Sequence, residues 1–172
     1  LVGVAAPQPL GVIPGRPKCR GMSGLGAGRD TIDVAGATRA GIVVPNIPDF
    51  CIEEQADHTM ALILAIARQL PRMSRAMTEG AWTRSRDDSS NNHRLSTRTL
   101  GLVGFGGSGR ETARRAAGFG MRVLATRRDM GAPSEAADQL GVEMVDLDTL
   151  IRESDYISLH LPLNQATYHL FN

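Results

Sequence analysis

The sequence predicts an α/β fold in which helices alternate with the strands of a parallel sheet. Two observations carry this prediction. Between residues 99 and 160, short apolar segments alternate with helical segments, which is the order typical of a parallel sheet. The first strand, Thr99–Val103, leads directly into Gly104–Gly109, whose glycines have the spacing G-x-G-x-x-G. With right-handed crossovers, these elements give the first half of a Rossmann-type doubly wound parallel sheet.

The elements of this sheet follow one another closely along the chain. The predicted strands are Thr99–Val103, Arg122–Thr126, Glu143–Val145 and Tyr156–His160. The predicted helices between them are Gly109–Gly118, Ser134–Leu140 and Leu147–Glu153. Gly120 and Gly141 each follow a predicted helix, where a left-handed cap is common.

The residues before this sheet predict the end of another α/β unit and two helices. The unit has strands at Leu1–Ala5 and Gly41–Val44, separated by a Gly-rich turn and by Pro14–Gly21, which suits neither a helix nor a strand. A long helix is expected from about Phe50 to Leu70. Its second half is apolar on almost every face, which predicts burial between two layers. Pro71 ends or kinks that helix.

A second amphipathic stretch covers Met73–Trp82, and Ser85–His93 is expected to be a polar loop. The chain thus divides into residues 1–48, residues 49–92 with the interdomain helices and linker, and residues 93–172 with the N-terminal half of a nucleotide-binding domain. Because the chain begins and ends close to apparent strands, we expect an internal fragment of a longer protein.

The glycine turn predicts a dinucleotide site because each glycine has a physical role there. Gly104 permits the tight turn, Gly106 lets the main chain approach a pyrophosphate, and Gly109 lets helix and strand pack closely. The free N–H groups and the dipole of the following helix favour an anion. The alternative is a turn with a structural role only.

The end of the second strand favours NADP over NAD as the cofactor. An acidic residue about 20 positions after the glycines normally binds the ribose hydroxyl groups and selects NAD. Thr126, Arg127 and Arg128 stand there instead, and arginine binds a phosphate through paired N–H donors. In the alternative, both arginines are solvated loop residues and Asp129 reaches the ribose.

Composition gives no reason to expect a nucleic-acid or membrane partner. The chain has 172 residues, of which 42% are hydrophobic, and a net charge of +1. That charge does not favour binding to nucleic acid or to an anionic membrane surface. The longest apolar run, Met60–Ala67, is too short to cross a bilayer, which needs about 20 residues.

The cysteines and histidines predict neither disulfides nor a metal site. Cys19 and Cys51 have no paired spacing and no secretory signal precedes them, so free thiols and a cytoplasmic location are expected. The four histidines form no metal-ligand pattern.

Five motifs occur in an order and spacing that resemble one protein family. They are Gly24–Asp33, Ala37–Pro48, Glu54–Thr59, the glycine turn and Ser158–Leu163. Together they resemble the D-isomer-specific 2-hydroxyacid dehydrogenases, which include phosphoglycerate dehydrogenase and glyoxylate/hydroxypyruvate reductases. The resemblance covers nearly the whole chain. It implies a flavodoxin-like substrate domain that ends at residue 48, an NAD(P)-binding domain, an active site between the two, and usually a homodimer.

The same resemblance assigns substrate contacts to Ala27 and Gly28. They match the loop whose main-chain N–H groups meet the substrate carboxylate, and Ala27 also borders the nicotinamide of the cofactor. Main-chain donors suit a carboxylate because they hold the anion without a flexible side chain. In the alternative, the glycines of the Gly26-Ala27-Gly28 turn only turn a strand.

Further cofactor contacts follow from the resemblance. Gly107 and Ser108 match the variable positions of the glycine turn whose main chain meets the pyrophosphate. Leu161, beside Pro162, resembles the loop along the adenosine half of the cofactor. His160 belongs to a cofactor-side strand end of the family and is not expected to be catalytic.

The chain also departs from the family pattern. Many members carry Arg or Lys and then Ile where Gly107 and Ser108 stand here, so the helix start is looser and an apolar anchor is missing. Arg29 replaces a residue that is usually apolar. Asp57 and His58 fit a structural role at the domain junction.

No catalytic residue is predicted in this chain. The resemblance implies hydride transfer between nicotinamide and a 2-hydroxy or 2-keto acid, with a histidine that moves the proton, a glutamate that raises its basicity and an arginine that holds the substrate. All three belong to motifs after Ser158–Leu163, so we expect the isolated chain to be inactive. The alternative is a dehydrogenase-like corepressor that senses a nucleotide without catalysis, since fold alone does not decide function.

Overall fold

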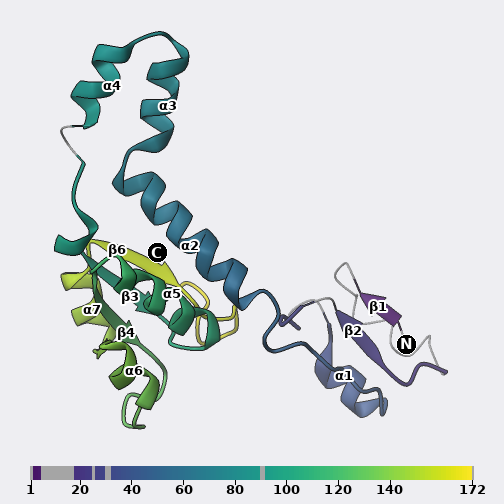
Figure 1. Ribbon diagram of the computed structural model, residues 1–172. Helices are drawn as coiled ribbons and strands as arrows, with labels where there is room; N and C mark the ends of the chain where they lie inside the picture. The colour runs from purple at the N-terminus through teal and green to yellow at the C-terminus, as the bar shows by residue number, and fades with distance from the viewer. Residues whose placement is uncertain (1, 5–17, 25, 30–31, 90–91, 172) are drawn as a thin grey trace. The chain divides into compact units, whose positions relative to one another are not determined.

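The structure is a computed structural model, which describes residues 2–4, 18–24, 26–29, 32–89 and 92–171. The chain forms two compact units. One consists of Leu1–Cys51 and Pro162–Asn172, and the other of Ile52–Leu161. Residues 52–89, which the sequence places in an interdomain segment, belong to the same compact unit as the sheet that follows them (Figure 1).

The larger unit is built on a parallel sheet of four strands. These are β3 (Thr99–Val103), β4 (Arg122–Thr126), β5 (Glu143–Met144) and β6 (Tyr156–Leu159), in the order β5-β4-β3-β6. The chain proceeds outward from β3 to β5 and then returns to the other side of β3 as β6. The predicted sheet is confirmed, with β5 and β6 each one residue shorter than expected. The strand order reverses between β3 and β6, which is where open α/β sheets bind ligands.

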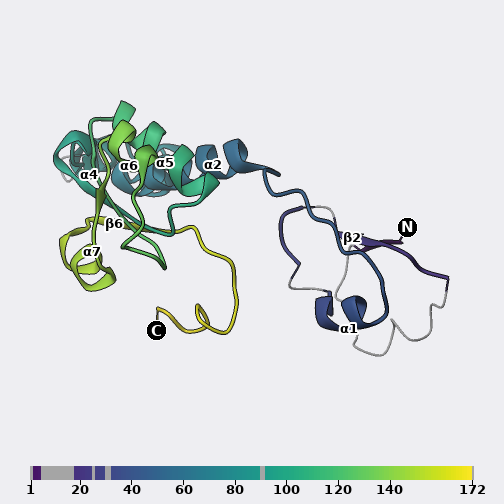
Figure 2. The same cartoon turned by 90° about the horizontal axis from the view of Figure 1, so that it is seen from below.

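Helices cover both faces of this sheet. They include α5 (Gly107–Gly118), α6 (Glu135–Leu140) and α7 (Leu147–Glu153). Successive strand residues point to opposite faces. Accordingly, Val123 of β4 belongs to the core beneath α5 and α6, whereas Leu124 packs with Leu150 of α7. Figure 2 shows α5 and α6 on one side of the sheet and α7 on the other, as a doubly wound fold requires.

Local signals set the ends of these helices. The Ser134 hydroxyl accepts a hydrogen bond from the Ala137 N–H at 3.3 Å and begins α6. Gly120 and Gly141 have φ values of +71° and +64°, so both predicted left-handed positions are confirmed.

Among the described residues of this unit, the α-helices α2 (Ile52–Ala67), α3 (Leu70–Thr78) and α4 (Trp82–Ser89) and the short 3-10 helix η1 (Leu95–Thr97) precede the sheet. The predicted helix to Leu70 ends earlier because Gln69 has a left-handed conformation, with φ of +52°. Pro71 then lies in the first turn of α3, where its missing N–H has no cost. The prediction of a polar loop at Ser85–His93 was wrong for Ser85–Ser89, because α4 continues through these residues. These residues have no apolar periodicity that would have indicated a helix.

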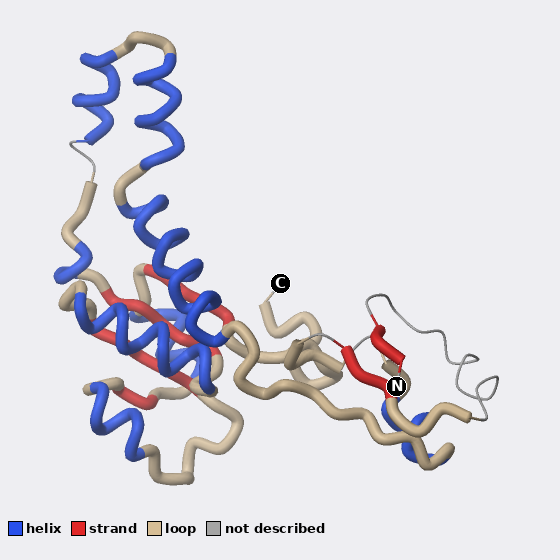
Figure 3. The backbone as a smooth tube through the Cα atoms, turned by 45° about the vertical axis from the view of Figure 1, so that its right-hand side comes forward, coloured by secondary structure: helices blue, strands red, loops and turns tan. Residues whose placement is uncertain are grey.

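The prediction that the second half of α2 is buried all round was also wrong. Met60, Ile63 and Ala67 are buried against the sheet side, whereas Leu62 and Ile66 are 53% and 67% exposed. The reason is that α2 forms an outer layer of this unit, so only one of its faces has a neighbour. Beyond α2, the paired helices α3 and α4 extend away from the sheet (Figures 1 and 3).

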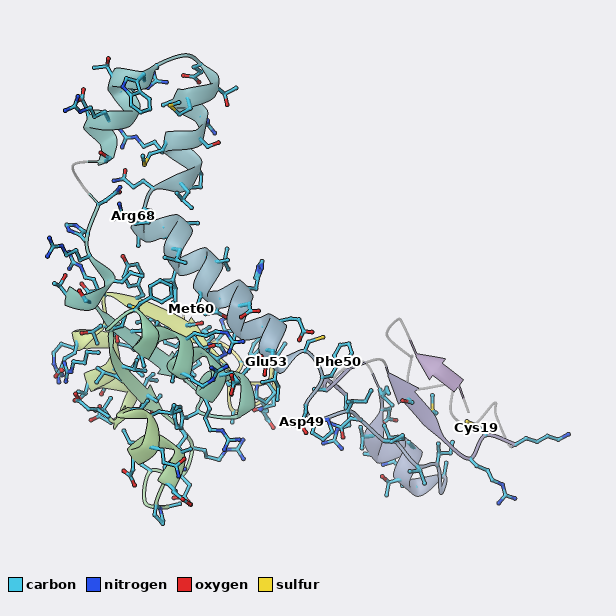
Figure 4. All side chains as sticks on the ribbon, viewed as in Figure 1. Cys19, Asp49, Phe50, Glu53, Met60 and Arg68 are labelled. Atoms are coloured by element: carbon cyan, nitrogen blue, oxygen red, sulfur yellow. The ribbon has the colours of Figure 1, made fainter. Side chains whose placement is uncertain are left out.

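An ion-pair network fixes α2 to α5. The Arg115 guanidinium lies 2.5 Å from Asp57, 2.8 Å from Glu111 and 3.1 Å from Glu53. Figure 4 shows Glu53 at the end of α2 next to α5, and Met60 further along the helix. Arg115 is largely buried by these partners, and its hydrogen bond to Asp57 is the main cause that raises the pKa of its guanidinium. The geometry supports a structural role for Asp57.

The smaller unit contains two parallel strands, β1 (Val2–Val4) and β2 (Met22–Gly24), and the helix α1 (Val34–Arg39). The strand predicted at Gly41–Val44 was wrong, because only Val43 forms a bridge, to Gly21. Neither β2 nor α1 was expected. Met22 and Ala37, both fully buried, pack with Ile32 and Ile42. Most of the predicted irregular stretch 14–21 lies outside the described residues.

None of the helices among the described residues is long and apolar enough to span a membrane.

Candidate functional site

The glycine turn lies at the carboxyl ends of β3 and β6, where the strand order reverses. The N–H of Gly104 donates to the carbonyl oxygen of Thr126 at 2.9 Å, which fixes the turn to the end of β4. Gly104 has a φ of +106°, and a Cβ on it would overlap the carbonyl oxygen of His160. A Cβ on Gly109 would overlap the carbonyl oxygen of Gly104. Both positions therefore require glycine.

The start of α5 presents free main-chain donors. Gly106 is the N-cap, and the first helical hydrogen bond joins the Arg110 N–H to the Gly106 carbonyl oxygen at 2.9 Å. The N–H groups of Gly107, Ser108 and Gly109 precede that bond and have no acceptor within the helix. A Cβ on Gly106 would meet no atom within 4 Å, so the surface before this turn is open. Such a helix end binds anions.

His160 lies directly behind the turn. Its Nδ1 is 3.2 Å from the hydroxyl oxygen of Ser108, and its Nε2 is 3.0 Å from that of Ser158. Burial lowers the pKa of the His160 imidazole. The predicted site residues did not include Ser158, although it begins the motif Ser158–Leu163. Its signal was the alternation of a strand, which places residues 158 and 160 on one face.

The two predicted phosphate-binding arginines have different surroundings. Thr126 is nearly buried at the end of β4. The Arg127 guanidinium donates to the carbonyl oxygens of Ala132 and Pro133, and its buried Nε has no hydrogen-bond partner among the described residues. Arg128 is exposed. Arg127 thus holds its own loop, and Arg128 is the more accessible of the two.

Leu161 and Pro162, the predicted adenosine-side residues, follow β6 and belong to different units. Leu161 packs against Val103, Leu124 and Leu150, beneath the carboxyl end of the sheet. The carbonyl oxygen of Pro162 accepts a hydrogen bond from the Thr167 hydroxyl at 2.6 Å, within the smaller unit.

In the smaller unit, Ala27 and Gly28 lie in an exposed turn. The Asn46 side-chain amide donates to the carbonyl oxygen of Ala27 at 3.1 Å, and the Ile47 N–H donates to that of Gly26 at 3.2 Å. The segment that begins at Asn46 therefore orients this turn. Among the described residues, neither the Ala27 nor the Gly28 N–H has a protein acceptor, so both remain available to an anion.

Comparison with known proteins agrees with this geometry. Residues 60–172 match the family model of the D-isomer specific 2-hydroxyacid dehydrogenase NAD binding domain. The chain belongs to this family. The resemblance predicted from the motifs and the Rossmann-type fold are thereby confirmed.

The similar curated proteins include reductases of small acids. The chain is 39% identical to a glyoxylate reductase of Thermococcus litoralis over 90% of this chain and 47% of the relative. It is 42% identical to a hydroxypyruvate reductase of Thermotoga maritima over 86% of this chain and 45% of the relative. The chain therefore spans about half the length of the curated relatives it matches.

Solved structures give the same result. D-mandelate dehydrogenase of Rhodotorula graminis matches with a TM-score of 0.90 and 27% identity, over 98% of this chain and 50% of that one. D-lactate dehydrogenase of Aquifex aeolicus, solved with NAD and lactic acid, matches with a TM-score of 0.88 and 30% identity, over 98% and 49%. The family is one of NAD-dependent oxidoreductases, and the glycine turn lies inside its NAD-binding domain.

Proposed function

We propose that the whole protein transfers a hydride between a nicotinamide dinucleotide and a small 2-hydroxy or 2-keto acid, and that this chain supplies the dinucleotide site. The observation that carries the proposal is the glycine turn at the switch point of the sheet, with free N–H groups at the start of α5 and open space before Gly106. Relatives named glyoxylate and hydroxypyruvate reductases support the substrate class.

The residues present fit a bound dinucleotide. The N–H groups of Gly107, Ser108 and Gly109 would hold the diphosphate, and Gly106 leaves room for its approach. Leu161 and Pro162 would border the adenosine half. When bound, the dinucleotide supplies the carbon that gives or takes the hydride.

We propose that Ala27 and Gly28 contribute to the substrate side of the reaction. Their exposed N–H groups would hold the substrate carboxylate, and Ala27 would border the nicotinamide. The hydrogen bond from Asn46 to Ala27 keeps this turn in place.

No motif of this chain matches the family's catalytic histidine, glutamate and arginine, so we propose that the 172-residue chain binds dinucleotide without turnover. We expect quenching or enhancement of NAD(P)H fluorescence on titration with the chain, and no oxidation of NAD(P)H when glyoxylate or hydroxypyruvate is added. Absence of binding would contradict the site, and turnover by the pure chain would contradict the assignment of catalysis to other residues. Turnover by the whole protein would exclude the corepressor alternative.

We further propose that the cofactor is NADP, with Arg128 as the accessible partner of the 2′-phosphate. We expect Arg128→Ala to weaken NADPH binding about tenfold and to leave NADH binding unchanged, since a charge-assisted hydrogen bond contributes roughly 1.5 kcal/mol. Parallel fluorescence titrations with both cofactors measure this difference.

The matched control is Arg39→Ala, which removes an exposed arginine of α1. It should leave both affinities unchanged. Equal or tighter binding of NADH by the wild-type chain would contradict the NADP assignment.

We also propose that the whole protein is a homodimer, as the family resemblance implies. Several large apolar side chains of α2, α3 and α4 are exposed, and they support a second copy as the partner that covers these helices. They are Leu62, Ile66, Leu70, Met77 and Trp82. Exposed large apolar side chains that gather on one surface typically mark an interface.

Sedimentation velocity tests the dimer. We expect Leu62→Glu with Ile66→Glu to convert a dimer into a monomer. The control Ile151→Glu changes a similarly exposed apolar residue on α7 and should leave the dimer intact. A wild-type protein that is monomeric at micromolar concentration would refute the dimer.

A further inference from the structure

His160 contacts the glycine turn through its main chain although it follows another strand. Its N–H donates to the carbonyl oxygen of Val103 at 2.8 Å, which extends the pairing of β3 and β6 beyond the end of β6. Its carbonyl oxygen occupies the space where a side chain on Gly104 would lie, and its Cβ is 3.6 Å from the Cβ position of Gly109. The first and last glycines of the turn are therefore packed against His160.

The His160 ring adds a hydrogen-bonded connection to α5. A neutral imidazole has one donor nitrogen and one acceptor nitrogen. One of the two serine hydroxyls, Ser108 at 3.2 Å or Ser158 at 3.0 Å, therefore donates to the ring, and the other accepts from it. Both ring nitrogens are occupied, so the ring has a fixed orientation between β6 and the first turn of α5.

Ser108 is the residue through which this connection can act on the turn. In the segment 106–109 it is the one residue with a side chain, because the other three are glycines. Glycine main chain loses the most conformational freedom when it is ordered. Without an anchor, the N–H groups of this segment would have to be ordered when an anion binds, and this ordering weakens binding.

We propose that His160 is a positioning residue for the anion-binding turn: supported by Ser158, it holds Ser108 so that the N–H groups of Gly107, Ser108 and Gly109 converge on the diphosphate. The inference rests on the proposed dinucleotide site. Ser108 departs from the family pattern, and the inference explains its role. Its hydrogen bond to His160 takes the place of the missing apolar anchor.

Calorimetric titration of the 172-residue chain with ADP-ribose, and NMR titration with adenosine as the ligand without phosphate, test the proposal. We expect Ser108→Ala and His160→Gln each to weaken ADP-ribose binding about fivefold, the effect of one lost hydrogen bond, and to leave adenosine binding unchanged. Ser108→Thr keeps the hydroxyl group and should bind ADP-ribose with wild-type affinity. The controls Ser74→Ala and His58→Gln make the same changes at exposed positions of α3 and α2.

The outcomes separate this inference from the proposed function. If the wild-type chain does not bind ADP-ribose, the dinucleotide site and the role of His160 both fail. If the wild type binds and both variants bind equally well, only the role of His160 fails. Equal weakening of ADP-ribose and adenosine binding would show a general structural role and would overturn positioning. Should His160→Gln fail to fold, Ser108→Ala and its rescue by threonine decide the result.

Discussion

Gly104→Ala is expected to destabilise the larger unit more than a glycine-to-alanine change at any other position of the glycine turn. The new Cβ meets two independent obstacles. The φ of Gly104 is +106°, a main-chain conformation that residues with a side chain rarely adopt. The Cβ would also overlap the carbonyl oxygen of His160. We expect the free energy of unfolding to fall by roughly 3 kcal/mol or more, since main-chain strain and overpacking add.

The main chain around Gly104 has little freedom to relax. The Gly104 N–H is bonded to Thr126, and the His160 N–H is bonded to Val103. Moving the turn away from His160 would break the first of these bonds, and moving His160 would break the second. Because single domains are typically stable by only about 5–15 kcal/mol, a large part of the stability would be lost. Urea denaturation followed by circular dichroism measures the change.

Gly118→Ala is the matched control, since it adds the same methyl group at the far end of α5, away from the glycine turn. Its Cβ would meet no atom within 4 Å, and Gly118 is helical. We expect this variant to gain up to about 0.5 kcal/mol in stability, because alanine loses less conformational freedom in a helix and Gly118 is the last residue of α5. Similar stabilities for the two variants would contradict the steric account of Gly104.

The sheet and the glycine turn were predictable because their signals are local. Strands such as Thr99–Val103 are short apolar runs with clear breaks, and the glycines of the turn fall between a strand and a helix. The left-handed caps at Gly120 and Gly141 follow from the same local logic. In this region the pattern of each segment and its place in the fold agree, so sequence alone was sufficient.

The elements that were missed depend on contacts distant in sequence. β2 is a strand because Met22 is buried against Ile32, Ala37 and Ile42, whereas its own sequence resembles a turn. The exposure of Ile66 depends on whether another element packs on the outer face of α2. The hydrophobic periodicity of the helix does not show this. In both cases tertiary packing overrides local pattern.

The same limit applies to the candidate site. The glycines and the two arginines were identified from spacing. That Arg127 turns back to the carbonyl groups of its own loop, and that Ser108 meets His160, follow from how side chains meet across elements. Departures from a family pattern therefore have to be judged in the fold, since no local motif predicts that His160 is the partner of Ser108.

Gly106→Ala is expected to leave the stability nearly unchanged and to reduce dinucleotide affinity by a factor of about ten or more. In the free protein a Cβ at this position meets no atom within 4 Å, and the φ of −82° is accessible to alanine. The loss of stability should stay within about 1 kcal/mol, which is the typical difference between a good N-cap and alanine.

The affinity should fall because the open space before Gly106 is the space that the proposed diphosphate would occupy. A methyl group there would push the phosphate oxygens away from the N–H groups of α5, and each charge-assisted hydrogen bond that is lost contributes roughly 1.5–3 kcal/mol. Calorimetric titration with NADPH and ADP-ribose, beside a urea denaturation curve, measures both quantities on one sample. Unchanged affinity would place the diphosphate elsewhere. A large loss of stability would instead mean that Gly106 has a structural role, like Gly104. The two glycines, two residues apart, thus separate what the turn needs in order to fold from what it needs in order to bind.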